Sequence, residues 1–144
     1  WKRSVPNPAM LVFDAPFRES CTLRRPRTNT PLQALNLMND PTYVEASRML
    51  AQRMMREGGQ SVDTRIIFGF RSLVARAPKP AEMAILRSAY DRSRMDFEKD
   101  PASAKALLAV GEAKNDIALN PVELAAFTGL ASTLLNLDEV ITKE

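Results

Sequence analysis

The sequence predicts an all-α protein: a compact bundle of five or six helices with an extended, proline-rich N-terminal arm. Three observations predict this class. Apolar residues recur at helical spacing through most of the chain after residue 30. A capping residue stands directly before proline at four places, which is a strong signal for helix starts. The 144 residues, 45% of them apolar, are enough for one domain with one core.

The four cap–proline pairs are Thr30-Pro31, Asp40-Pro41, Asp100-Pro101 and Asn120-Pro121. A small polar side chain at the cap accepts a hydrogen bond from a free N–H of the first turn. Proline fits the first helical position, where its missing N–H would have had no partner. We predict in particular that Thr30 and Asp40 cap two successive helices and fix the bend between them.

Apolar spacing predicts helices over about 31–39, 41–57, 63–76, 80–98, 101–110 and 121–137. In the first, Leu32, Leu35 and Met38 are expected to face the bundle. The pair Gly58-Gly59 ends the second helix, as glycine does in a left-handed cap. The last helix has the broadest apolar surface, so we expect it to be the central one.

Residues 1–30 show neither helical nor strand periodicity, and four prolines interrupt them. The apolar run at 9–13 fits one strand or an extended segment, and no partner strand is evident elsewhere. We therefore expect an extended arm over 1–30, packed on a helical body over 31–144, within one domain.

The net charge of +3 originates in the N-terminal part. Residues 1–27 carry six basic and two acidic side chains, a balance of +4. The remaining 117 residues carry 14 basic and 15 acidic side chains, a balance of −1. A nucleic-acid-binding domain usually has basic residues along a recognition face, so we expect no nucleic-acid partner.

Histidine is absent and Cys21 is the single cysteine. These counts exclude a His-based metal site, a Ser-His-Asp triad, and a zinc ribbon or iron–sulfur cluster held by this chain alone. We expect no metal and no cofactor in this chain. No window approaches the ~20 apolar residues of a membrane span. The chain begins at Trp1 without a leader or a methionine, so we expect a fragment or a processed product.

The candidate site is a cluster of arginines, Arg24, Arg25 and Arg27, just before the first predicted body helix. They suit an anion or partner site, aided by the free N–H groups of that helix. Alternatively, they tie the arm to the body by pairing with Asp14 and Glu19. Two acids also suggest acid–base catalysis, but nothing fixes their separation, so we assign no catalytic residue.

Four stretches carry a resemblance to a known family: WKRSVPNPAMLVFDAPFRESCTLRRPRTNTPLQALNLMNDPTYVEAS, RIIFGFRSLVARAPKPAE, LLAVGE and LASTLLNLDEVITKE. Taken in this order, they resemble the C-terminal domain of unknown function of the large cytochrome-c-associated proteins of planctomycetes. The similarity covers essentially the whole chain, and the first stretch is its most specific part.

The resemblance implies a piece of a larger protein exported to the periplasm or cell surface, with any haem in another domain. It assigns no catalytic residue to this chain. It favours a non-catalytic structural or interaction module that binds other domains of the same polypeptide or an envelope protein. The alternative is part of a composite active site completed by an upstream domain, with the arginine-rich arm binding an anionic group.

Overall fold

The computed structural model describes residues 8–16, 21–24, 26 and 28–142. These residues form eight helices and no strand, which confirms the all-α prediction. Six correspond to the predicted helices, and the short α1 and α8 are additional. The bounds are α1 Pro8–Val12, α2 Pro31–Asn39, α3 Pro41–Glu57, α4 Val62–Val74, α5 Pro80–Lys99, α6 Pro101–Leu108, α7 Pro121–Leu135 and α8 Asp138–Ile141.

All four predicted cap–proline pairs begin a helix. The Thr30 hydroxyl accepts from the Gln33 N–H at 3.3 Å, and the Gln33 side chain accepts from the Thr30 N–H at 2.9 Å, which completes a capping box. Asp40, Asp100 and Asn120 each accept from the N–H two residues further on, at 2.8, 3.1 and 3.0 Å. Asp40 also ends α2 in an extended conformation, so one residue makes the bend that the sequence predicts.

The run at 9–13 is not extended: it forms most of helix α1, so this prediction is wrong. Pro8 occupies the first turn, where a missing N–H costs nothing. The N–H groups of Phe13 and Ala15 bond the carbonyls of Ala9 and Met10 at 3.1 and 2.9 Å. Asp14 then takes a left-handed conformation, with φ of 56°, which ends the helix. One short turn is below the length at which periodicity can identify a helix.

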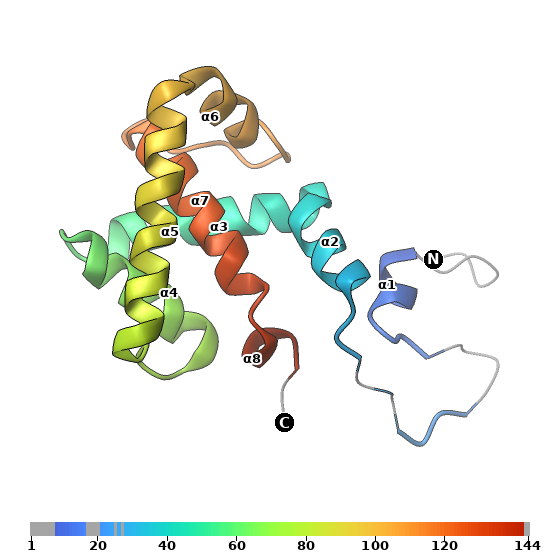
Figure 1. Ribbon diagram of the computed structural model, residues 1–144. Coiled ribbons are helices and arrows are strands. Elements are labelled where there is room, and N and C mark those ends of the chain that lie inside the picture. The colour runs from blue at the N-terminus through green and yellow to red at the C-terminus, as the bar shows by residue number, and fades with distance from the viewer. Residues whose placement is uncertain (1–7, 17–20, 25, 27, 143–144) are drawn as a thin grey trace.

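Helix α7 lies at the centre of the bundle, as predicted, and packs against α2, α3, α4, α5, α6 and α8 (Figure 1). Its alanines Ala125, Ala126 and Ala131 are fully buried and let neighbouring helices approach closely. Phe127 and Tyr90 of α5 are also fully buried, with ring centroids 4.5 Å apart. No helix in the described part of the chain is long and apolar enough to cross a membrane.

Candidate functional site

The predicted arginine site lies only partly within the described residues. Arg24 is exposed and forms no ion pair among them, whereas Arg25, Arg27 and Glu19 lie outside the described residues. Asp14 accepts hydrogen bonds from the N–H and the hydroxyl of Thr28, at 3.0 and 2.6 Å. This contact joins two parts of the arm to each other.

Gln33 holds the arm to the body, and sequence reasoning did not identify this role. Its side chain is 1% exposed and donates to the Val12 carbonyl at 2.9 Å and to the Thr28 hydroxyl at 3.0 Å. The same amide accepts from Thr30 in the capping box. A signal was available, because glutamine three residues after a threonine cap is the capping-box pattern. One buried amide therefore starts α2 and anchors α1.

Leu32, Leu35 and Met38 form an exposed apolar face on α2, which we call the α2 surface. Their exposed fractions are 56%, 56% and 53%, so the prediction that they face the bundle is wrong. The opposite face, with Gln33 and Leu37, is the buried one. Tertiary contact with the arm decides the orientation, because Gln33 must reach Val12 and Thr28.

Polar residues at helical spacing on α3 bind the loop over 109–120. The Glu45 carboxylate accepts from the N–H groups of residues 112 and 113, at 3.1 and 2.6 Å. Arg48, 1% exposed, donates to the Ala113 carbonyl at 2.8 Å and to the Asn115 amide oxygen. Gln52 accepts from the Asp116 N–H at 3.2 Å. These bonds satisfy the backbone of an irregular loop, so the row is structural.

Arg76 joins the α4–α5 corner to α8. Its guanidinium donates to the Glu82 carboxylate at 2.9 and 2.8 Å and to the Glu139 carboxylate at 3.1 and 2.8 Å. A further bond reaches the Ala77 carbonyl at 3.2 Å. Together, these hydrogen bonds use all five N–H groups of Arg76. The Arg76 guanidinium, followed by the Lys79 N–H, lowers the pKa of Glu82 from 4.5 to about 2.

A hollow of about 340 Å³ lies beside Arg76, with an apolar floor that includes Phe70, Ile85 and Leu86. The Arg76 guanidinium lies over the Phe70 ring, 4.9 Å from its centroid. Since every donor of Arg76 is already bonded within the protein, this arginine has none left for an anionic ligand.

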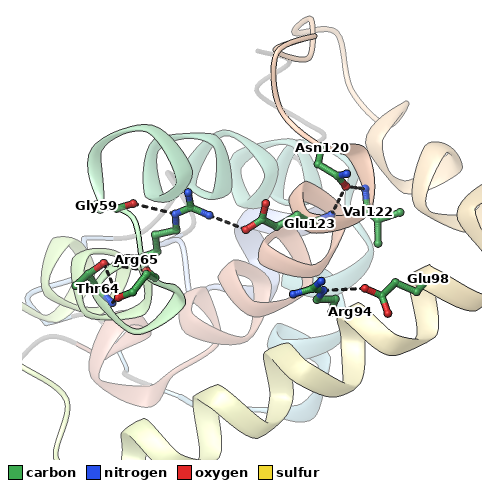
Figure 2. Close-up of polar contacts among 9 residues, drawn as sticks. Gly59, Thr64, Arg65, Arg94, Glu98, Asn120, Val122 and Glu123 are labelled. Atoms are coloured by element: carbon green, nitrogen blue, oxygen red, sulfur yellow. Dashed lines mark hydrogen bonds and ion pairs between the residues drawn. The ribbon is translucent and has the colours of Figure 1, made fainter.

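A second hollow of about 340 Å³, which we call the polar pocket, lies between α5 and the start of α7. It is lined by Arg94, Glu98, Asn120, Val122 and Glu123 (Figure 2). The Arg94 Nε donates to Glu98 at 2.8 Å. The Asn120 amide oxygen accepts from the N–H groups of Val122 and Glu123, at 3.0 and 3.1 Å. The first N–H groups of α7 are thereby satisfied within the protein.

Arg65 of α4 reaches the edge of the polar pocket. Its Nη1 donates to the Glu123 carboxylate at 2.6 Å and its Nε to the Gly59 carbonyl at 3.0 Å (Figure 2). The Arg65 side chain is 15% exposed and lies over the Phe127 ring, 5.8 Å from the centroid. Each acid at the pocket is thus paired with an arginine, and the local charge sums to zero.

Tyr90 of α5 is 0% exposed and does not line the polar pocket. The Arg94 side chain interacts with the Tyr90 hydroxyl, although no described residue meets the geometry of a normal hydrogen bond with it. Burial, followed by the Glu123 carboxylate, raises the pKa of this hydroxyl. The group therefore keeps its proton at neutral pH. Sequence reasoning could not identify this hydroxyl, since a tyrosine at a core position predicts only packing.

The next question is whether Cys21 or the acidic residues come together in the described part of the chain. Cys21 is exposed, and no group of three or more acids or cysteines within the described ranges is placed to hold a metal ion. The acids at the two hollows are held in ion pairs with arginines, apart from Asp138, which accepts from Asn29 at 2.6 Å. What the described residues offer is therefore an apolar face, a polar pocket and a network of structural ion pairs.

An all-α domain with these features is matched over residues 1–90 by one family model, described as PSD1, protein of unknown function (DUF1553). The match covers more than half of the chain, so the chain belongs to this family. Neither the curated proteins nor the solved structures contain a match to the chain.

Proposed function

We propose that this chain is a non-catalytic interaction module that binds another domain of a larger polypeptide through the α2 surface. The observation that carries this proposal is the exposure of Leu32, Leu35 and Met38, each more than half exposed on one nine-residue helix. Isolated exposed leucines are ordinary, but three on one face of a short helix are typical of an interface.

The rest of α2 supports this use of the helix. Gln33 fixes the opposite face to the arm, and the capping box fixes its start. A helix held in this way presents its exposed face in one orientation, so binding would require little further ordering.

The resemblance of the four quoted stretches supports the identity of the partner. On this proposal the larger polypeptide is a cytochrome-c-associated planctomycete protein that is exported, and any haem lies in a domain other than this one. An interaction role is favoured over a composite active site because Asp14 binds Thr28 within the arm and the exposed Arg24 lines neither hollow.

The test is binding of this chain to the remainder of the larger polypeptide, measured by calorimetry. Changing both Leu32 and Leu35 to Gln should weaken binding by at least tenfold, the equivalent of about 1.4 kcal/mol. Stability should stay within about 0.5 kcal/mol of the wild-type value, because both side chains are exposed. Ile85→Gln is the matched control, since Ile85 is 68% exposed on α5. Equal affinity of the double variant and the control would refute the proposal.

A further inference from the structure

The hollow beside Arg76, which we call the apolar hollow, is separate from the α2 surface. Its lining residues come from α4, α5, α7 and α8 and from the connections between them. No residue of α2 lines it, so a ligand here is distinct from the domain proposed to bind the α2 surface. The volume of about 340 Å³ falls at the small end of the range typical of small-molecule sites. A hollow enclosed by several helices suits a small, compact ligand.

The floor of the apolar hollow is hydrocarbon. Phe70 and Leu86 belong to the core and are only 2% and 5% exposed, yet both line the hollow. Ile85 also lines it and is 68% exposed, so part of this apolar surface remains in contact with water. Covering that surface with the apolar part of a ligand is favourable, because it removes hydrocarbon from water.

The charged residues that line the apolar hollow have a negative excess. They are Arg76, Glu82, Asp138 and Glu139, one guanidinium against three carboxylates, which gives −2. Lys79, which does not line the hollow, acts on Glu82 and reduces this excess without removing it. Helix α8 has only four residues, so the partial positive charge at its start is small. The hollow therefore attracts a cation and repels an anion.

The polar side chains of the apolar hollow offer hydrogen-bond acceptors and no donors. All five N–H groups of Arg76 are bonded within the protein. The Thr133 hydroxyl donates to a carbonyl of its own helix at 3.1 Å, which leaves only its lone pairs. Asp138 accepts from Asn29 and Thr142 through Oδ1, so its Oδ2 accepts from no donor among the described residues. Only a ligand that donates can bond these side chains.

We propose that the apolar hollow binds a small apolar organic cation, a hydrocarbon or aromatic body that carries one ammonium group. The body packs against Phe70, Ile85 and Leu86, and the ammonium donates to Oδ2 of Asp138. A hydrogen bond between two charged groups is stronger than one between neutral groups. A neutral molecule of the same shape lacks this bond, and an anion faces three carboxylates.

Titration of the chain followed by two-dimensional NMR tests this site, with phenethylamine as the probe. Phenylethanol and phenylpropionate are its neutral and anionic counterparts, and ethylamine has the charge without the ring. A ligand of about nine non-hydrogen atoms is expected to bind in the millimolar range. Phenethylamine should shift the amide signals of Phe70, Ile85 and residues 137–139. Phenylethanol should bind several-fold more weakly, and phenylpropionate and ethylamine should give no saturable shift.

One pair of variants completes the experiment. Asp138→Asn removes the charge and keeps an amide oxygen that can accept from Asn29. It should weaken phenethylamine binding about fivefold or more, because the charge-assisted bond is lost. Phenylethanol should bind this variant as it binds the wild type, which shows that the hollow itself is retained. Asp96→Asn is the matched control, since Asp96 is exposed on α5 and does not line the hollow; it should leave phenethylamine binding unchanged.

Three results would each overturn the inference. One is the absence of a saturable shift at about 20 mM phenethylamine. Another is binding of phenylpropionate as tight as that of phenethylamine. The third is wild-type affinity of Asp138→Asn for phenethylamine.

Discussion

Arg48 shows how a single residue can hold a distant part of the chain. Its guanidinium is 1% exposed, and its donors serve the Ala113 carbonyl and the Asn115 side chain, more than 60 residues away. A buried charge is expensive, and hydrogen bonds to it must offset the lost hydration. Glu45, 3.7 Å from the guanidinium, supplies the counter-charge and also binds the loop itself.

Arg48→Ala should lower the free energy of unfolding by about 3 kcal/mol, because it removes a buried side chain together with its hydrogen bonds to the loop and leaves Glu45 without its counter-charge. Arg53→Ala is the matched control on the same helix. Arg53 is 56% exposed, pairs with the exposed Glu57 and lies 5.8 Å from the centroid of the Phe68 ring, so its loss should cost under about 1 kcal/mol. Urea denaturation of both variants measures the difference, and equal losses would contradict a structural role for Arg48.

Glu82 makes stability depend on acid pH. Its pKa is about 2 in the folded protein and ordinarily 4.5, so its ion pair stabilises the fold fully above pH 4.5. That contribution is lost as the pH falls from 4.5 towards 2. Melting temperatures measured across this range should therefore fall less steeply for Glu82→Gln than for the wild type. Asp96 is exposed on the same helix, and the control variant Asp96→Asn should follow the wild-type curve. Identical curves for all three proteins would rule out a role of Glu82 in acid stability.

Helix starts were predictable, whereas the orientation of one helix was not. Capping depends on residues within three positions of each other, so Thr30, Asp40, Asp100 and Asn120 could be identified from local chemistry alone. Helix α2 has only nine residues and apolar side chains on more than one face, so spacing could not show which face is buried. That choice depends on Gln33 and the arm, a contact that no helical pattern encodes.

At the scale of elements, Thr30→Ala and Asp40→Ala should each cost about 1 kcal/mol, the usual effect of losing a cap. The two variants should differ in what they disturb. Thr30 belongs to the network of Gln33 that anchors the arm, whereas among the described residues the Asp40 carboxylate accepts from the Thr42 N–H alone. Hydrogen exchange should therefore increase over residues 8–16 in Thr30→Ala but not in Asp40→Ala. The same increase in both would show that the capping box does not hold the arm.

The whole molecule combines a bundle built around α7 with an arm attached beside α2 (Figure 1). The class of fold and the central helix followed from the sequence, because apolar spacing and caps agree over most of the chain. The polar pocket and the loop contacts of α3 could not be predicted from the sequence, since each joins residues that lie far apart in the chain. The α2 surface could be recognised only as apolar; its exposure is a property of the assembled fold.

Oxidation of methionines by hydroxyl radicals, read by mass spectrometry, tests the central claim most directly. Met38 on the α2 surface and Met95 on α5 are 53% and 54% exposed, so each serves as a reference for the other. In this chain alone, the two should oxidise at similar rates. In the full-length polypeptide, Met38 should be protected several-fold while Met95 is not, because burial at an interface removes a side chain from solvent. Equal oxidation of Met38 and Met95 in the full-length polypeptide would contradict the proposal that the α2 surface binds a neighbouring domain.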